Sequence, residues 1–413
     1  MSVYEDLSDE ELWDQSRSDD LFDRADSLME LGERKLKAGD WALAKNLFGS
    51  SYDLYIQQDR NAEAGKANYS FGYCLYSLKE YVDALEALER SLAIGREIND
   101  SRVIAFSAGP LGDTLAALER PDEAIETYGL AIDTFAELEE FYSAGINSLS
   151  QGELYGVKGM QTSSLASFLR AYNIFQSAGD AFGAARAKDR MASALIELGD
   201  YEQALAHIKD ALATFEFMEV EERIVHMNYR LGWTHVLAGN NAKARKPLKF
   251  AIRKLKEAKE FSGAALAELE LITALHRLDD DDQVDELSRR TDRIRAYFEH
   301  AGELHNVCYV DLLTAEKFMG LKLHEAAAEI FRDVIERAAV IENRSLIRSS
   351  KASLAEALFL MGRHQEAKAV LDEIDSKDWG ENQPELDKLE KVKNLMLEKM
   401  AETLNIIVPE SDK

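Results

Sequence analysis

The stretch that decides the fold runs from residue 185 to residue 218 and reads ARAKDRMASALIELGDYEQALAHIKDALATFEFM. Its first part, residues 185–198, and its second part, residues 201–218, both place apolar side chains three or four positions apart, as on one face of an α-helix. Gly199 and Asp200 lie between them, and this dipeptide is typical of the end of one helix and the start of the next. The stretch therefore predicts two amphipathic helices joined by a tight turn.

This two-helix pattern recurs along the chain at a constant interval. One position of the repeat carries a small residue, and so does a second position in the following helix. The first set is Gly32, Gly72, Gly112, Gly152, Ala192 and Gly232, and the second set is Ala44, Ala84, Ala124, Ser164, Ala204 and Ala244. Small residues allow two helices to approach closely, so we expect Gly72 and Gly112 at contacts between paired helices. Farther along, the pattern continues with a shift of two residues at Ala326 and of one more at Ala367.

The repeat resembles the tetratricopeptide repeat, in the longer variant of about forty residues that occurs in kinesin-light-chain-like and Rap-like proteins. The likeness rests on the small residue in the first helix, the Gly-Asp or Lys-Glu turn and an aromatic-x-x-Ala motif in the second helix, as in LGDYEQA at residues 198–204. It covers residues 20–374. The resemblance implies an all-α fold, a right-handed superhelical solenoid of about nine helix pairs, in which the first helix of each pair lines a concave groove.

The two ends of the chain predict caps, which a solenoid needs for solubility. Residues 1–19 predict an acidic N-terminal cap, with a short helix opened by a capping box of Ser8 and Glu11. Residues 375–413 predict a C-terminal capping helix followed by a tail. Within the solenoid, Pro110 falls inside a first helix, where we expect a kink or a late helix start.

Composition bears on several classes of protein. The 413 residues carry a formal net charge of -27, which argues against a general affinity for nucleic acid. No run of about 18 apolar residues occurs, so we expect no membrane span. The only cysteines, Cys74 and Cys308, lie far apart, and we expect a reduced, cytoplasmic protein.

No motif for catalysis or for a cofactor is present in the sequence. There is no glycine-rich phosphate loop and no GxSxG motif, and the eight histidines lack the spacing of metal ligands. The HEAAAE segment at His324 lacks the second histidine of a zincin motif. We therefore expect no cofactor, and a protein that is not an enzyme.

A candidate partner-binding surface lies on the first helices, which the resemblance places along the groove. Arginine beside aromatic rings suits a carboxylate or a phosphate and an extended peptide. Side chains of these kinds share one helix face in the repeat at residues 221–237, and equivalent positions in two other repeats carry further members. The candidate groove residues are Arg186, Arg190, His226, Tyr229, Arg230, Trp233, Tyr69 and Tyr73. The alternative is that Arg190 and Arg230 pair with neighbouring acids such as Asp189 and Glu197.

A second candidate surface lies on the second helix of the sixth repeat. Residues 241–260 hold eight basic and two acidic side chains, a net charge of +6 that is opposite in sign to that of the chain. At 100° per residue, the apolar stripe is Ala244, Leu248, Ala251 and Leu255, and a basic ridge on the other side is Lys246, Lys249, Arg253 and Lys256. We expect the ridge to be exposed, either as a partner surface or only as a solvated face.

The acidic cap offers one partner for this basic ridge. Residues 1–30 hold eleven acidic side chains against Arg17 and Arg24. A contact between the cap of one copy and the ridge of another would be a heterologous self-association. The alternative is that the acidic residues only keep the protein soluble.

These features predict a non-enzymatic scaffold whose groove binds a peptide or a protein segment. A second hypothesis is a peptide-responsive Rap-like regulator, although such regulators carry an additional N-terminal effector or DNA-binding domain, and too few residues precede the first repeat for one. A third hypothesis is binding of nucleic acid or another anionic partner through residues 243–259, which the surrounding negative charge opposes. Salt-dependent binding to DNA or RNA would separate this third hypothesis from the other two.

Overall fold

The computed structural model describes residue 4, residues 6–276 and residues 284–374. In this part of the chain all regular structure is helical, and no strand is present. The helices are α1 (Asp9–Gln15), α2 (Leu21–Lys37), α3 (Trp41–Gln57), α4 (Asn61–Ser77), α5 (Tyr81–Glu97), α6 (Ser101–Ala117), α7 (Pro121–Glu137), α8 (Phe141–Val157), α9 (Gln161–Ser177), α10 (Ala181–Glu197), α11 (Tyr201–Phe217), α12 (Glu221–Leu237), α13 (Asn241–Glu257), α14 (Phe261–His276), α15 (Val284–Ala301), α16 (Leu304–Gly320), α17 (His324–Val340), α18 (Arg344–Leu360) and α19 (His364–Asp372).

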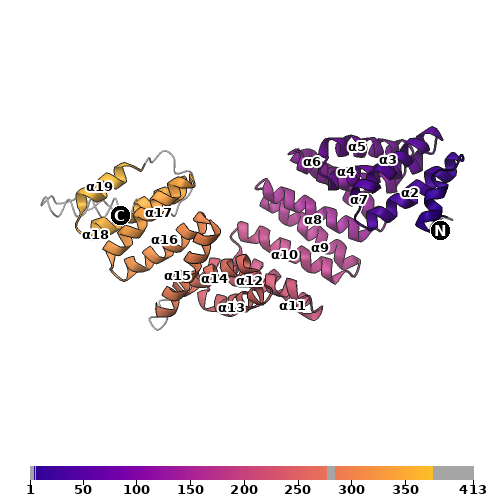
Figure 1. Cartoon of the computed structure of the whole chain (residues 1–413). Coiled ribbons are helices and arrows are strands. Elements are labelled where there is room, and N and C mark those ends of the chain that lie inside the picture. The colour runs from indigo at the N-terminus through magenta and orange to yellow at the C-terminus, as the bar shows by residue number, and fades with distance from the viewer. Residues whose placement is uncertain (1–3, 5, 277–283, 375–413) are drawn as a thin grey trace, which may run out of the picture. The chain divides into compact units, whose positions relative to one another are not determined.

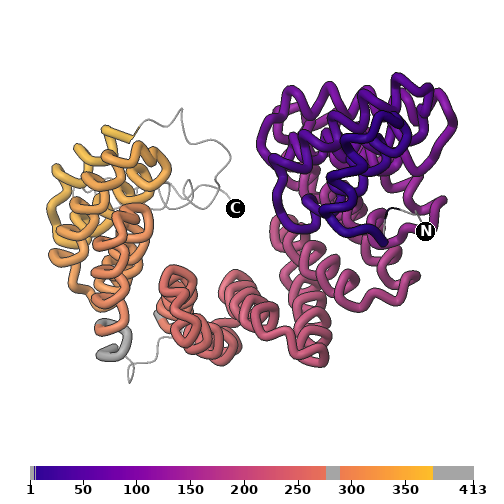
Figure 2. The backbone as a smooth tube through the Cα atoms, turned by 45° about the vertical axis from the view of Figure 1, so that its right-hand side comes forward, coloured from indigo at the N-terminus to yellow at the C-terminus, as the bar shows by residue number. Residues whose placement is uncertain are grey.

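The chain divides into two compact units, residues 1–227 and residues 228–413, with the boundary inside α12. Within each unit, consecutive helices run back and forth beside one another, as the ribbon and the tube show (Figures 1 and 2). Within the described residues, α2 to α19 form nine successive pairs, in agreement with the expected all-α solenoid of about nine pairs.

A single turn geometry connects the helices and sets the period of the repeat. From α2 to α14, the helices begin at a constant interval, as the first residues Leu21, Trp41 and Asn61 illustrate. The amide N–H of Gly39 donates to the carbonyl oxygen of Leu36, and the next amide donates to the carbonyl oxygen of Lys35, at 3.0 and 2.9 Å. These two bonds form a Schellman motif, which places Gly39 in the left-handed region with φ 80°. Equivalent bonds close all the other connections from α2 to α14 and from α15 to α19, both within a pair and between pairs.

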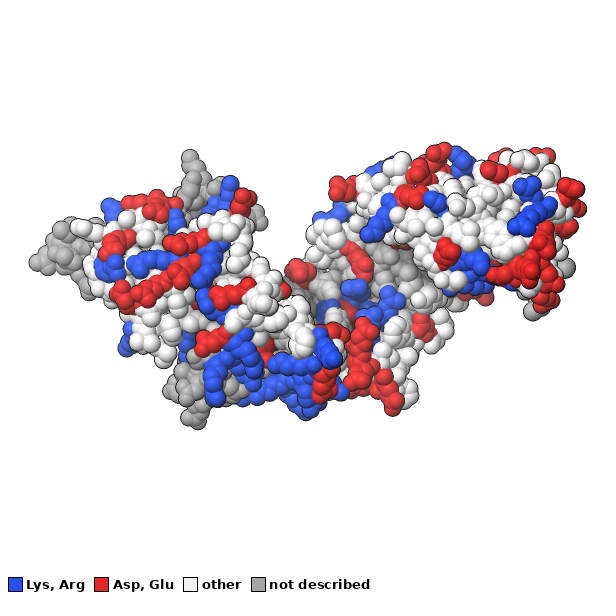
Figure 3. All heavy atoms as spheres, in the orientation of Figure 1, with Lys and Arg blue, Asp and Glu red and all other residues white. Residues whose placement is uncertain are grey.

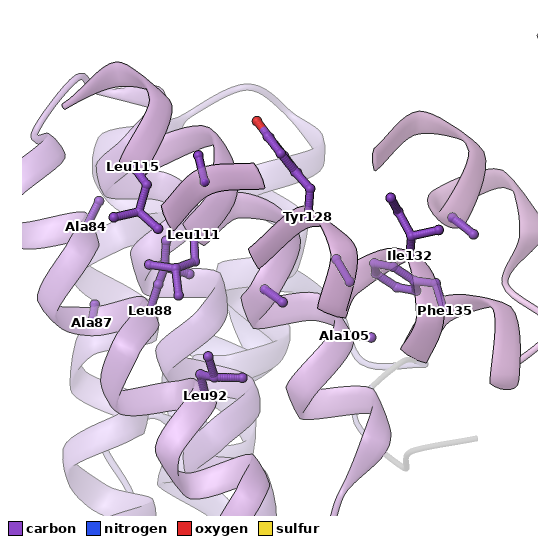
Figure 4. Close-up of a cluster of buried hydrophobic side chains, with 14 of the residues drawn as sticks. Ala84, Ala87, Leu88, Leu92, Ala105, Leu111, Leu115, Tyr128, Ile132 and Phe135 are labelled. Atoms are coloured by element: carbon purple, nitrogen blue, oxygen red, sulfur yellow. The ribbon is translucent and has the colours of Figure 1, made fainter. Parts of the chain in front are cut away.

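The small residues of the repeat lie where paired helices touch, as expected for Gly72 and Gly112. A Cβ atom added at Gly72 would lie 2.6 Å from Cγ of Leu88, and one at Gly112 would lie 2.7 Å from the ring of Tyr128. The helices can therefore approach closely only because these positions lack a side chain. Figure 4 shows the core that this approach creates between α5, α6 and α7. It contains Ala84, Ala87, Leu88, Leu92, Ala105, Leu111, Leu115, Tyr128, Ile132 and Phe135.

Helix α1 covers the first repeat. The capping box expected at Ser8 and Glu11 is present: the backbone N–H of Ser8 donates to Oε2 of Glu11 at 2.7 Å, and the backbone N–H of Glu11 donates to Oγ of Ser8 at 3.2 Å. Leu12 is fully buried in a cluster that contains Leu28 and Leu31 of α2. The C-terminal capping helix and tail expected at residues 375–413 lie outside the described residues.

Three details of the repeat differ from the expectations. The first helix expected to include residues 185–198 begins earlier, at Ala181, because the side chain of Asp180 accepts a hydrogen bond from the backbone N–H of Gly183 and caps it. The pattern shifts by three residues in a single step between α14 and α15, rather than in two steps. The residue at the small, buried position of α17 is therefore Ala327, which is fully buried, and not Ala326.

The late helix start expected at Pro110 is wrong. Helix α6 runs without interruption from Ser101 to Ala117 with Pro110 inside it. Proline removes the helical hydrogen bond to the carbonyl of Phe106, four residues earlier, at a cost of about 3 kcal/mol. Ala108 and Leu111 are buried on either side of the proline, and this packing outweighs the local cost.

In the first unit, the first helices of successive pairs contact one another. Helix α4 contacts α6, α6 contacts α8, and α8 contacts α10, in addition to the contacts of each helix with its neighbours in sequence. Contacts between successive first helices bring one face of α4, α6 and α8 into a continuous surface, and the candidate site lies on that surface.

Candidate functional site

A pocket with a volume of about 240 Å³ opens on the face formed by the first helices α2, α4, α6 and α8 of the first unit. Its lining is mostly apolar and aromatic, with a few polar side chains. The lining residues are Leu36, Tyr69, Ser70, Tyr73, Phe106, Gly109, Pro110, Asp113, Phe135, Ser143, Ile146, Asn147 and Ser150. An apolar wall with a small number of polar groups is the usual composition of a ligand site.

Aromatic rings from three helices form one wall of the pocket. The ring of Tyr69 stacks on that of Phe106, with centroids 5.6 Å apart, and Phe106 meets Phe135 edge to face at 5.1 Å. Tyr73 has its own aromatic neighbour, Trp41, at 5.7 Å. Rings that are packed in this way cannot collapse into the pocket, so the apolar surface is preformed.

An acidic group lies at one end of the pocket. The ring of Tyr128 from α7 packs on Gly112, and its hydroxyl donates a hydrogen bond of 2.6 Å to Oδ1 of Asp113. The pKa of the Asp113 carboxyl is raised, first because burial disfavours its charged form and further because Glu153 is negative, whereas the bond from Tyr128 opposes the rise. Asp113 thus accepts a hydrogen bond in a partly buried position, where burial strengthens such a bond.

Helix α8 contributes a polar row to the same pocket. Ser143, Asn147 and Ser150 are four and three residues apart and share one helix face. The side chain of Asn147 donates from Nδ2 to the carbonyl oxygen of Ser143 at 2.8 Å. Its Oδ1 lies over Gly109, where an added Cβ atom would be only 3.1 Å away. The row thus adds amide and hydroxyl groups to a pocket whose other wall is aromatic. Groups of these kinds can form hydrogen bonds with a peptide backbone.

Of the residues predicted for the groove, Tyr69 and Tyr73 line this pocket. Arg186 and Arg190 lie on α10 of the same unit. The alternative that the arginines pair with acids holds for Arg190, although its partner is neither Asp189 nor Glu197: its Nε lies 2.9 Å from Oε1 of Glu153 on α8. Glu153, the partner of Arg190, is also the residue whose negative charge contributes to the raised pKa of Asp113.

The other predicted groove residues lie on α12. Nδ1 of His226 is 4.0 Å from Oδ2 of the buried Asp189. Tyr229 packs against a core cluster of the second unit that includes Leu248, and burial raises the pKa of its hydroxyl to about 12. Only 7% of Arg230 is exposed, and Trp233 is half-buried. A ligand contact by these side chains stays a prediction.

Phe106, Asp113 and Asn147 line the pocket but were not among the residues predicted for the groove. The period of the repeat contains a signal that would have found two of them. Asp113 occupies the position that Tyr73 occupies one repeat earlier, and Phe106 occupies the position that Arg186, another predicted residue, occupies two repeats later. Asn147 has no comparable signal, because asparagine at an equivalent position is not repeated in the neighbouring pairs.

The basic ridge on α13 is accessible along its length, as expected, since Lys246, Lys249, Arg253 and Lys256 are exposed. On the other side of the helix, Ala244, Leu248 and Ala251 are fully buried. In the first unit, exposed acidic residues gather around α1 and α2, and Figure 3 shows both groups of charge.

Within the described residues, neither a metal-ligand cluster nor a membrane-spanning helix occurs. In that part of the chain, no group of three His, Cys, Asp or Glu side chains could hold a metal ion. None of the described helices is long and apolar enough to cross a membrane.

Comparison with protein families agrees with the geometry of the helix pairs. A family model of the tetratricopeptide repeat matches residues 63–137, which cover most of α4 to α7, and a second tetratricopeptide-repeat model matches residues 190–258. The chain contains tetratricopeptide repeats. The candidate pocket thus involves the first helices of four consecutive repeats, and the basic ridge lies on the second helix of a later one.

Two solved structures have a similar fold, and a third is less similar. The apo form of RapI has 14% sequence identity and a TM-score of 0.55, over 81% of this chain and 98% of that one. The apo form of the quorum sensor NprR from B. thuringiensis has 15% identity and a TM-score of 0.52, over 79% and 91%. Kinesin light chain repeats from Podosopora anserina have 16% identity and a TM-score of 0.42, over 48% and 97%. No curated protein matches the sequence. Identities this low show the fold alone.

Proposed function

We propose that the pocket of the first unit binds an extended peptide or a protein segment, and that the protein acts as a non-enzymatic scaffold through this contact. The observation that carries the proposal is the combination of a preformed aromatic wall, Tyr69 and Phe106, with the polar groups of Asp113 and Asn147 in the same pocket. An extended segment has both an apolar side chain for the wall and backbone groups for the polar row.

The charges of the pocket indicate which class of ligand fits it. Asp113 accepts hydrogen bonds, and Glu153 adds negative charge to its surroundings. A positively charged group of the segment, such as an N-terminal amine or a basic side chain, would find its place near Asp113. The ion pair of Arg190 with Glu153 limits this negative region toward α10.

The hypothesis of a peptide-responsive regulator uses the same pocket and the same ligand class. It differs only in the consequence of binding. A cytoplasmic location, in which Cys74 and Cys308 stay reduced, fits the observation that both are buried free thiols. Nucleic acid is not the expected ligand, because the net charge of -27 repels a polyanion.

The test uses a phage-displayed library of random linear peptides selected on the native protein. Peptides that are enriched should lose at least about tenfold in affinity on Tyr69→Ala and on Asn147→Ala, as expected when about 1.4 kcal/mol of contact is removed. The matched control is Glu126→Ala, a truncation at an exposed position of α7 that does not line the pocket. Circular dichroism checks that all variants keep their helices. Equal affinity of the selected peptides for the native protein and for both pocket variants would contradict the proposal.

A further inference from the structure

The second unit carries a basic surface that the pocket does not use. It consists of the ridge on α13, which is Lys246, Lys249, Arg253 and Lys256, together with Arg290 and Arg293 of α15. Figure 3 shows basic side chains gathered over these two helices. Both are second helices of their repeats, whereas the pocket of the first unit is built mainly on first helices.

A buried acid holds one side of this basic surface in place. Glu268 of α14 has a fully buried side chain and contacts Lys256 at 3.4 Å, Arg293 at 3.2 Å and Arg290. One carboxylate therefore meets three cations from two helices. It fixes their positions and leaves an excess of positive charge at the surface.

The other side of the basic surface is not neutralised. Lys246 and Lys249 are exposed, and neither has an acidic partner within the described part of the chain. Among the described residues, the acidic partner of Arg253 is Glu257, and its Nε lies 4.0 Å from Oε1 of that residue. Like charges three and four residues apart on a helix destabilise it by about 0.2–0.5 kcal/mol per pair. A docked acidic surface would remove this repulsion.

The N-terminal end of the same chain carries a short acidic surface. Leu12 turns the apolar side of α1 into the core, and Asp6, Glu10 and Asp14 are exposed. Asp9 is not available, because it pairs with Arg34 and Lys35. At a helical rise of 1.5 Å per residue, the ridge from Lys246 to Lys256 is about 15 Å long. Glu10 and Asp14 lie about 6 Å apart along α1, and Asp6 precedes the helix, so the acidic segment can lie within the length of the ridge.

We propose that the basic surface on α13 and α15 of one copy binds the acidic segment at α1 of a second copy. Each copy offers one surface of each kind, so the contact is heterologous and can continue from copy to copy. The net charge of -27 on every copy opposes close approach. At 0.15 M ionic strength, charges beyond about 8 Å are largely screened, so the local attraction prevails at contact.

A second copy fits this surface better than nucleic acid does. A duplex carries its charge along its whole length and would extend from the basic surface over acidic parts of the chain. The acidic segment at α1 is short and opposite in charge to the basic surface.

The test compares the native protein with two charge-reversed variants by sedimentation velocity. The variants are Lys249→Glu with Arg253→Glu, and Glu10→Lys with Asp14→Lys, all at exposed positions. At 0.1 M salt, the native protein should form species heavier than the 46.4 kDa monomer, and these should dissociate at 1 M salt, where the Debye length falls to about 3 Å. Each variant alone should be monomeric. An equimolar mixture of the two variants should again form species heavier than the monomer, because the two reversed surfaces are opposite in charge and so are the two unchanged ones.

The matched control is Arg96→Glu with Lys209→Glu, which makes the same change in charge at exposed positions of α5 and α11 and should associate like the native protein. A native protein that is monomeric at every salt concentration overturns the proposal. So does a mixture of the two variants that stays monomeric. Binding of a duplex DNA oligonucleotide by a monomeric native protein, lost on Lys249→Glu with Arg253→Glu, would assign the surface to nucleic acid instead. None of these outcomes depends on the peptide selection.

Discussion

At the residue scale, the ionised carboxyl group of Asp113 destabilises the fold, and it is also a hydrogen-bond acceptor in the lining of the pocket. Burial raises the pKa of Asp113 above the usual value for an aspartate. The folded chain therefore binds this proton more tightly than the unfolded chain does. The stability that results from the difference is fully present below the unfolded pKa and is lost as the pH rises through the folded pKa. At neutral pH, the charged side chain lowers the free energy of unfolding.

The variant Asp113→Asn should raise the thermal midpoint at pH 7. An amide cannot ionise, and its oxygen can still accept the hydrogen bond from Tyr128. The gain should shrink as the pH falls through the raised pKa of the native carboxyl group, and it should be absent below the unfolded pKa of about 4, where this group is neutral in both the folded and the unfolded native chain. Thermal unfolding followed by circular dichroism at several pH values measures both effects. A midpoint at pH 7 below that of the native protein would show that the charge of Asp113 stabilises the fold.

Two glycines in helix interiors should respond to alanine in opposite directions. Gly72→Ala places a methyl group 2.6 Å from Cγ of Leu88 and should destabilise by about 1–3 kcal/mol through overpacking. At Gly129, the nearest atom to an added Cβ is Nε2 of Gln151 at 3.7 Å, so Gly129→Ala should stabilise by about 0.5–1 kcal/mol through helix propensity. Urea unfolding of both variants measures the two signs. A gain in stability for Gly72→Ala would mean that the contact of Gly72 with Leu88 does not limit the helix approach. A loss for Gly129→Ala would mean that helix propensity does not decide the effect there.

At the element scale, the Schellman turn between helices requires a left-handed residue at each connection described from α2 onward. Seven of these turns use glycine there, and nine use another residue, such as Lys79 at φ 64° or Glu119 at φ 58°. A side chain in this region costs about 1–2 kcal/mol. Gly-Asp and Lys-Glu turns at different connections therefore share one backbone geometry, and they differ in the strain that the left-handed residue adds.

Replacing Lys79 by glycine should therefore stabilise the chain. We expect a gain of about 0.5–1 kcal/mol in the free energy of unfolding, since the removal of strain is partly offset by the greater freedom of glycine in the unfolded state. The reverse change, Gly199→Ala, should cost about 1 kcal/mol. No atom lies within 4 Å of a Cβ atom added at Gly199, so its loss reports the backbone alone. Urea midpoints decide the matter, and an unchanged midpoint for both variants would contradict the strain.

The helices were predictable from the sequence because their signals are local. The spacing of apolar residues and the small residue of each pair recur in successive repeats, and they identified Gly72 and Gly112 as contact points. The behaviour at Pro110 was not predictable in this way. Whether the helix continues through Pro110 depends on whether burial of the residues around it outweighs the local cost, and burial is a property of the assembled repeats.

At the scale of the whole molecule, the fold class was easier to predict from the sequence than the site. The period alone reveals which helices pair. It does not reveal that Tyr69, Phe106 and Phe135, from three different helices, meet to form one wall. The predicted groove included Arg190 and Arg230, whose charge draws attention in an acidic chain, whereas the pocket is built on aromatic rings and short polar side chains. Recognition by shape leaves a weaker trace in a sequence than recognition by charge.

The single turn geometry has a consequence for how such a chain can change in evolution. A segment of one full period, counted from the start of any helix between α2 and α12, includes two helices and two turns. Loss or duplication of such a segment joins the same turn to the same kind of helix, so no new junction has to arise. A change by one helix keeps the backbone geometry, but it brings two helices of the same kind together and loses the fit of Gly72 with Leu88. The chain can therefore gain or lose whole helix pairs without a new kind of junction, so we expect the number of repeats to differ between related chains.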